Sequence, residues 1–337
     1  MALAKENCGS IQNQVSYLQA ICNHSLDFIQ TTRVSRQLQN LYAHPEITES
    51  GLPSIRLAIL ASSTVDHLPP AIQVAALRRG LMVHCYIATY GQYRQEILNP
   101  TAKLSQFAPD VVLLALNAQE AGIKLPLTAS LEEVTASVEN RVEDWVKLWQ
   151  TVTQQLSAVV MHQTMVVAVE QIFGNYDVLV PAAPANILSM LNDALRKQAI
   201  EHQVLLVDID ALAASVGKQS WCDHPLWYHS KQDISPIHAP LYGEQVARIL
   251  AAIRGLSRKC LALDLDNTLW GGVIGDDGLA GIQLGQGSGI GEAYQAFQAY
   301  AKALKDRGII LAVCSKNDES NALEPFVKHP EMLLRRE

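Results

Sequence analysis

The chain lacks the features that mark membrane, secreted and nucleic-acid-binding proteins. No apolar run approaches the roughly 20 residues of a transmembrane helix, and the first residues do not place a charged segment before an apolar one, as a secretory leader does. The six cysteines show no C-x-x-C spacing, and 26 Lys and Arg face 33 Asp and Glu, a net charge of −7. We therefore expect a soluble, cytoplasmic protein with reduced thiols, whose main partner is neither nucleic acid nor a membrane.

The chain does contain enough apolar sequence for more than one core. Hydrophobic residues make up 49% of its 337 residues, a length typical of two domains. From residue 55 onward, short apolar runs alternate with segments of helical periodicity, which predicts an α/β sandwich with a mostly parallel sheet. The expected strands are 55–60, 82–87, 111–116, 159–169 and 204–208, and the expected helices are 70–79, 131–157, 185–201 and 243–252.

We expect an N-terminal helical segment (residues 1–50), an α/β domain (51–254) and a second α/β domain (255–337). In the helix 131–157, Trp145 and Trp149 share a face with apolar neighbours, which favours core positions over a binding surface.

Two aspartates directly follow the apolar run 260–263. Residues i and i+2 of a strand point to the same side, so Asp264 and Asp266 can face one reaction centre at the carboxyl end of a parallel strand. Two carboxylates this close favour a bound cation, and oxygen ligands suit Mg²⁺. One carboxylate can attack phosphorus while the other moves a proton. Asn267 and Thr268 are expected to fix the loop through hydrogen bonds to the backbone.

A second apolar run, 309–313, ends in Cys314 and Ser315. Residues 292–307, between the two runs, have helical spacing and end in Arg-Gly, a helix stop signal. The order strand, loop, helix, strand is that of a doubly wound fold.

These residues resemble the haloacid-dehalogenase (HAD) phosphotransferase superfamily, whose first motif is Asp-x-Asp-x-Thr. The resemblance implies that Ser315, with Asn267 and Thr268, holds the phosphoryl group. In detail the chain resembles the FkbH-like branch (HAD-IIIC type) of polyketide biosynthesis. The segments that carry this are 259–260, 270–273, 275–278, 284–285 and 314–317, with 91–97, 109–116 and 227–228 upstream.

The FkbH-like resemblance implies a transfer reaction. Such proteins take a glyceryl unit from 1,3-bisphosphoglycerate, or a related acyl phosphate, remove its phosphates and load it on the thiol of an acyl carrier protein. Asp264 would serve phosphoryl chemistry, Asp266 proton transfer, and both would hold Mg²⁺. Cys314 is the first candidate for the acyl-bearing thiol, Cys222 is weaker, and Cys260 is expected to be a small core residue. Lactate or another three-carbon unit remains open.

The HAD pattern also uses a later lysine and a later acidic pair. Neither Lys316 nor Lys328 stands at the position of that lysine, and no Asp-Asp pair follows Asn317. Residues 332–336 resemble the start of a third strand. We therefore expect an incomplete HAD domain, with weak Mg²⁺ binding and poor turnover in the chain as given.

Residues 51–254 also resemble the SGNH-hydrolase fold. Ser62 or Ser63 follows the first strand, Asn117 follows a later one, and His238 lies near the end, in the order of that family's site. The usual Gly-Asp-Ser setting is absent, and Asp233 is not three residues before His238. We expect an inherited scaffold with a vestigial site.

Three alternatives to the glyceryl transferase stay open. They are a simple Mg²⁺-dependent phosphatase, a non-catalytic module that binds an acyl carrier protein, and an SGNH esterase. Because carrier proteins are typically acidic, docking would need a local basic patch, for which Arg78, Arg79 and Arg94 are candidates.

Overall fold

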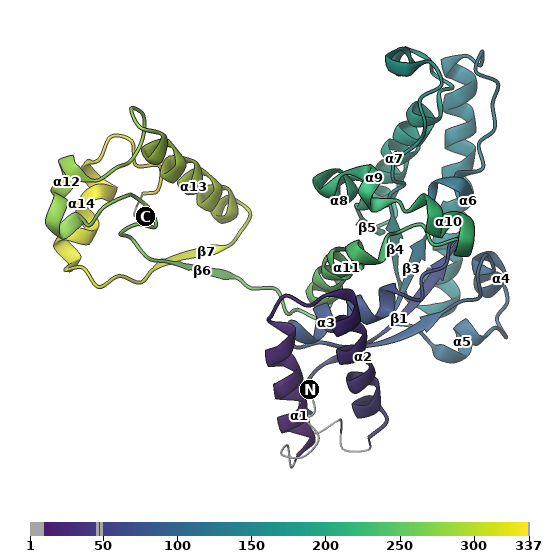
Figure 1. The fold of residues 1–337 in the computed structure, drawn as a ribbon, viewed down its shortest axis with the longest axis horizontal. Coiled ribbons are helices and arrows are strands. Elements are labelled where there is room, and N and C mark those ends of the chain that lie inside the picture. Colours follow the sequence, from purple (N-terminus) through teal and green to yellow (C-terminus); the bar gives the residue numbers. More distant parts are fainter. Residues whose placement is uncertain (1–9, 45–46, 48–49, 336–337) are drawn as a thin grey trace. The chain divides into compact units, whose positions relative to one another are not determined.

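The computed structural model describes residues 10–44, 47 and 50–335 (Figure 1). The chain divides into two compact units, Met1–Leu256 and Ser257–Glu337. No helix in the described ranges is both long and apolar enough to cross a membrane.

The first unit is built on a five-stranded sheet in which every strand is parallel to its neighbours, with the order β2-β1-β3-β4-β5. This confirms the expected α/β fold with a parallel sheet. Its strands read as near-continuous apolar runs because both faces are covered. The strands are β1 (Ser54–Ala61), β2 (Met82–Ile87), β3 (Val111–Ala115), β4 (Val159–Gln163) and β5 (Leu205–Val207).

The strand expected at 159–169 is too long, because β4 ends at Gln163. The neighbouring β5 has only three residues and pairs with Met161–Gln163. Beyond that point the backbone is held by side chains: the amide of Met165 donates to Asn192 Oδ1 (2.7 Å) and the amide of Val167 to Asp210 Oδ1 (2.8 Å).

Helices cover both faces of the sheet (Figure 1). Trp145 and Trp149 are fully buried in the core of one face, as predicted. That face carries α4 (Tyr93–Leu98), α5 (Lys103–Phe107), α6 (Leu131–Leu156) and α7 (Pro184–Glu201); the other carries α3 (Leu68–Arg78), α8 (Ile209–Val216), α9 (Lys218–Trp221) and α11 (Ala239–Ile253). Short elements complete the unit: η3 (Ala118–Ala121), η4 (Gly174–Leu179), α10 (His224–Ser230) and η5 (Pro236–His238).

The contact between α3 and α11 requires glycine at position 243. A Cβ atom there would lie 2.4 Å from the backbone carbonyl carbon of Ala71. The backbones of the two helices are therefore in direct contact at this point. Elsewhere in the core, side chains hold the backbones of neighbouring elements apart.

The N-terminal segment forms two helices, α1 (Ile11–Cys22) and α2 (Phe28–Tyr42). The start of α2 is fixed by a capping box, in which Asp27 and Gln30 exchange side-chain-to-backbone hydrogen bonds. Both helices pack on α3 through an apolar cluster that includes Val74 and Leu77.

The second unit has a two-stranded parallel sheet of β6 (Cys260–Leu263) and β7 (Ile310–Val313). The helices are α12 (Ile274–Gly281), α13 (Gly289–Asp306) and α14 (Glu319–Lys328). The third strand expected at 332–336 is absent over 332–335, and Arg336 lies outside the described residues. The amide of Leu333 instead donates to Gln298 Oε1 (2.9 Å), a side chain of α13.

Candidate active site

The ends of β6 and β7 lie side by side and carry the residues predicted to be catalytic. Leu263 of β6 lies opposite Val313 of β7, and the amide of Cys314 donates to the carbonyl of Leu263 (2.9 Å). Asp264 and Cys314 therefore leave the sheet side by side, and both side chains are exposed. The parallel pair brings a carboxylate and a thiol to one sheet edge, where open α/β sheets bind ligands.

Asp266 joins the two strand-end loops. Its Oδ1 accepts from Trp270 Nε1 and from the amide of Ile274, both at 3.0 Å, and its Oδ2 accepts from Asn317 Nδ2 at 2.8 Å. Burial acts to raise the pKa of Asp266, but the hydrogen bonds from Ile274, Asn317 and Trp270 outweigh it and hold the pKa below its usual value. Asp266 is thus kept ionised, which suits a proton acceptor better than a donor.

The loop after β6 is shaped by Asn267. This residue has a positive φ of 54°, and its Oδ1 accepts from the amide of Gly272 (3.1 Å). Gly272 itself has φ +95°, and a Cβ there would lie 2.6 Å from Asp277 Oδ2. The Asn267 side chain therefore holds the loop in shape. To bind phosphate, this side chain would have to give up its hydrogen bond to the amide of Gly272.

Ser315 and Thr268 keep their predicted places at the same edge. Ser315 Oγ accepts from the amide of Asn317 (3.2 Å), so its own hydrogen remains for a phosphoryl oxygen. The amide of Thr268 donates to the carbonyl of Leu265 (3.1 Å) within the loop.

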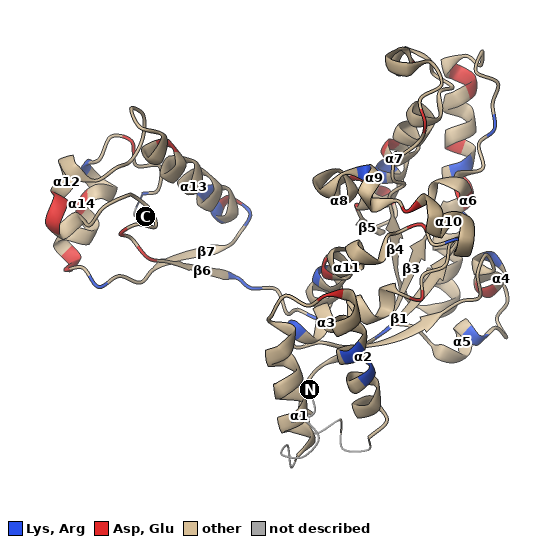
Figure 2. Ribbon diagram, viewed as in Figure 1, with Lys and Arg blue, Asp and Glu red and all other residues tan. Residues whose placement is uncertain are grey.

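The donor chemistry of this edge fits Mg²⁺. That ion usually keeps several waters and is held by one or two carboxylates together with substrate phosphate. Asp264 receives one amide hydrogen bond, from Leu265 to Oδ1 (2.8 Å), and Oδ2 of Asp264 has no hydrogen-bond partner among the described residues. No group of three His, Cys, Asp or Glu gathers as a metal site within the described ranges. Figure 2 shows acidic residues directly after β6 and on α12, so the surroundings favour a cation.

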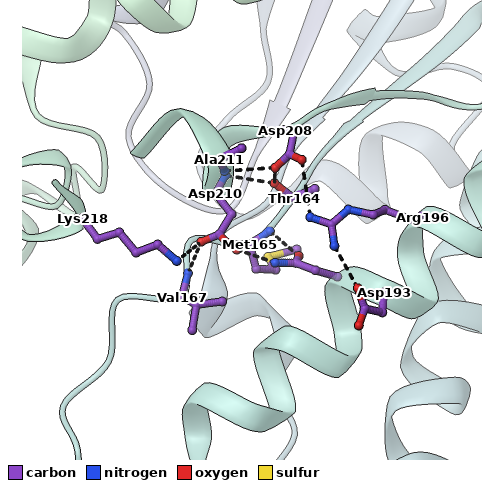
Figure 3. A network of polar contacts seen from close by, with 10 residues as sticks. Thr164, Met165, Val167, Asp193, Arg196, Asp208, Asp210, Ala211 and Lys218 are labelled. Atoms are coloured by element: carbon purple, nitrogen blue, oxygen red, sulfur yellow. Dashed lines mark hydrogen bonds and ion pairs between the residues drawn. The ribbon is translucent and has the colours of Figure 1, made fainter. Parts of the chain in front are cut away.

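A second Asp-x-Asp pair, which the sequence analysis passed over, follows β5. Figure 3 shows that its carboxylates are already paired. Asp208 Oδ1 accepts from Thr164 Oγ1 (3.0 Å), and Oδ2 lies 3.4 Å from Arg196 Nη2. Asp210 Oδ1 lies 2.7 Å from Lys218 Nζ. This pair of aspartates links the segment after β4 to the segment after β5. Its carboxylates already have partners, whereas Asp264 has a free carboxylate oxygen, so the pair is less available to a ligand.

The residues expected to form an SGNH-like site are only partly brought together. Ser62 Oγ donates to Asn117 Oδ1 (3.0 Å) and accepts from the amide of Asn117 (2.9 Å). Ser62 and Ser63 are buried. His238 does not join them: its Nε2 lies 2.9 Å from Ser220 Oγ, and its ring stacks on Trp221. The predicted combination of Ser, Asn and His238 is therefore wrong, because η5 turns His238 toward α9.

Of the described cysteines, only two are exposed. Cys260 was expected in the core but lies exposed on β6, as Cys314 does after β7. Burial raises the pKa of Cys22 to about 11 and those of Cys85 and Cys222 to about 12, so these thiols are poor nucleophiles. Cys260 is exposed because the two-stranded sheet leaves one of its faces uncovered.

Comparison with known proteins bears on the family and the fold of the chain. A family profile described as "FkbH, N-terminal domain" matches residues 56–251. Among solved structures, the N-terminal part of the protein BF1531 from Bacteroides fragilis, described as containing a phosphatase domain complexed with Mg, is 29% identical. That match covers 92% of this chain and 79% of that chain, with a TM-score of 0.78.

Two hydrolases also match over part of the chain, each at 12% identity. A lipase/acylhydrolase from Enterococcus faecalis covers 59% of this chain and 96% of its own, with a TM-score of 0.38. The acetyl xylan esterase AlAXEase covers 58% and 100%, with a TM-score of 0.39. No significant match was found among curated proteins.

Proposed function

Because the chain belongs to the FkbH family, whose N-terminal domain spans residues 56–251, we propose that it is a Mg²⁺-dependent phosphatase that also transfers a glyceryl unit to an acyl carrier protein. The observation that carries the proposal is the strand-end arrangement of Asp264 and Cys314, with Asp266 and Asn317 bridging the two loops. The likeness to the Mg-bound phosphatase domain of BF1531 supports the phosphatase part.

Acyl transfer begins at the thiol of Cys314. Its thiolate attacks the acyl carbon of 1,3-bisphosphoglycerate, the bond from that carbon to the phosphate oxygen breaks, and phosphate leaves with the electron pair. The thiol of the carrier then attacks the resulting thioester. A new thioester forms on the carrier, and Cys314 recovers its proton from that thiol.

Removal of the second phosphate uses Asp264. Its free carboxylate oxygen attacks phosphorus, the bond from phosphorus to the glyceryl oxygen breaks, and the glyceryl alkoxide takes a proton from water. A second water then hydrolyses the aspartyl phosphate, and the ionised Asp266 accepts its proton. Ser315 Oγ donates to a phosphoryl oxygen. Asp264 and Asp266 would hold Mg²⁺, which would supply positive charge to balance the phosphate.

The chain offers a matched pair of cysteines to test the acyl step. We expect incubation with 1,3-bisphosphoglycerate to add a phosphoglyceryl mass to the intact chain, or a glyceryl mass once the second phosphate is removed. The adduct should be absent in Cys314→Ala and present in Cys260→Ala. Both thiols are exposed, but Cys260 lies at the opposite end of the strand pair. An adduct that survives Cys314→Ala would refute the assignment. Phosphate release that continues without any adduct would leave a simple phosphatase.

Asp264→Asn tests the phosphoryl step separately. We expect Mg²⁺-stimulated phosphate release from a phosphate monoester to fall to background, while the cysteine adduct still forms, because the acyl step does not need this carboxylate. Release unchanged in Asp264→Asn would move the nucleophile elsewhere.

Docking of an acidic carrier protein is proposed on α3 and α11. Arg78, Arg79 and Arg248 converge on the single carboxylate of Glu244, which leaves an excess of positive charge. Arg94 does not contribute, because its Nε donates to Tyr93 Oη (3.0 Å) elsewhere. We expect Arg248→Glu to weaken carrier binding in a pull-down at low salt, and Lys197→Glu on the opposite side of the sheet to leave it unchanged. Equal binding by both variants would exclude this surface.

A further inference from the structure

A pocket lies in the first unit, at the carboxyl edge of the five-stranded sheet. Its volume is about 60 Å³, enough for roughly four waters or one three-carbon group. The pocket is lined by segments that follow β3 and β4 and by the stretch from the end of α9 to residue 233. The side chains that matter to the argument are Gln119, Asp223, His224, Trp227 and Asp233, with Cys222 beside them.

The walls of this pocket are held in place before any ligand binds. The segment after β4 is fixed by hydrogen bonds from the amide of Met165 to Asn192 and from the amide of Val167 to Asp210. Lys218 of α9 binds the same Asp210 carboxylate (Figure 3). The backbone of Cys222 pairs with that of Ile234 in an isolated antiparallel β-bridge, which fixes another part of the lining. A pocket with both apolar and polar walls that are already fixed can bind a ligand without first becoming ordered.

The charges that line the pocket are negative. Asp223 and Asp233 are present, and no Lys or Arg lines the pocket among the described residues. Asp223 Oδ1 caps α10 through the amide of Leu226 (3.0 Å). The carboxyl of Asp233 makes no hydrogen bond to any residue in the described ranges. Burial raises its pKa to about 6, only partly offset by His224, as expected for an acid that lacks a partner.

An aromatic face completes the lining. The ring of Trp227 already attracts one ammonium group, since Lys231 Nζ lies 5.2 Å from its centroid. A metal does not fit: Cys222, Asp223, His224 and Asp233 surround one space, yet no three such side chains in the described ranges gather as a metal site.

We propose that this pocket binds the ammonium group of a small aliphatic amine, with Asp233 as its counter-ion and Trp227 as its aromatic wall. Anions such as phosphates and carboxylates are excluded by the two aspartates. A neutral alcohol of the same size would leave the Asp233 charge uncompensated. The pocket is lined by residues of the first unit alone, and its proposed role does not rest on the proposed transferase activity.

The test uses propylammonium chloride as the probe, with 1-propanol and sodium propionate as neutral and anionic controls of equal size. Saturation-transfer NMR on the full chain at pH 7.5 and constant ionic strength detects binding in the millimolar range. We expect transfer to propylammonium only. Asp233→Asn should weaken binding at least tenfold, whereas Asp193→Asn, an exposed aspartate on α7, should leave it unchanged.

Trp227→Leu is a second variant that keeps the carboxylates, and it should weaken propylammonium binding about three- to tenfold. Transfer to 1-propanol equal to that of propylammonium would overturn the proposal. So would binding that persists in both Asp233→Asn and Trp227→Leu.

Discussion

Asp233 should cost the folded protein stability at neutral pH, and replacing it with asparagine should recover that loss. Its pKa of about 6, against an ordinary 3.8, means that the folded chain binds the proton more tightly than the unfolded chain. The free energy of unfolding therefore falls as pH rises from about 4 to about 6, and stays low above that range.

The difference in pKa sets the size of the effect. At 1.36 kcal/mol for each pH unit it corresponds to about 3 kcal/mol, an upper limit. Water in the pocket screens part of the charge, so we expect Asp233→Asn to be more stable by about 1–2 kcal/mol at pH 7.5. Near pH 4 the two chains should be about equal, because Asp233 is then protonated.

Urea unfolding of both chains at pH 4.5, 5.5, 6.5 and 7.5 measures this difference. The two chains must be compared at each pH, because other groups also make the stability depend on pH. Burial lowers the pKa values of His67 and His162 to about 4, so the protein loses stability as pH falls from about 6.5. That contribution is common to both chains and cancels. Asp193→Asn is the control. A gain that is constant with pH, or a loss at pH 7.5, would refute the reasoning.

Three further changes test the packing and the site. Gly243→Ala should lower the free energy of unfolding of the first unit by about 1–3 kcal/mol, measured in urea, because the new methyl group meets the Ala71 backbone. An unchanged urea midpoint would show that α11 can shift. Asn317→Ala removes a donor to Asp266, so the acidic limb of the phosphatase pH profile should move to higher pH, which an unchanged limb would contradict. Tyr242→Phe removes a buried hydrogen bond to the end of β4 and should cost about 1–2 kcal/mol by thermal unfolding, whereas no loss would mean that water replaces it.

Much of the fold follows from the apolar runs, and the failures have identifiable causes. The expected strand 82–87 matches β2, and the helix expected at 131–157 matches α6 within one residue. The strand 159–169 was overextended because its apolar residues continue, whereas a strand also needs a neighbour, and β5 is too short to provide one. The length of a partner strand is not visible within the run itself.

Some features of the candidate site also follow from the sequence, and others do not. Asp264 and Cys314 lie where two strand ends predict them. The donors to Asp266 come from four, eight and 51 residues away, and the last depends on how β6 and β7 align. His238 was misplaced because spacing along the chain does not reveal which way a short helix turns a ring.

The strand order has a consequence for the order in which the chain is made. β1 and β2 emerge first and pair, and β3, β4 and β5 are then added one after another on the same side of β1. During synthesis the sheet thus grows at one edge, and each intermediate exposes an unpaired strand there to other chains, of which β3 is entirely apolar. The last addition, β5, is only three residues long. So short a strand offers little further backbone for pairing, and the nascent sheet ends its growth there.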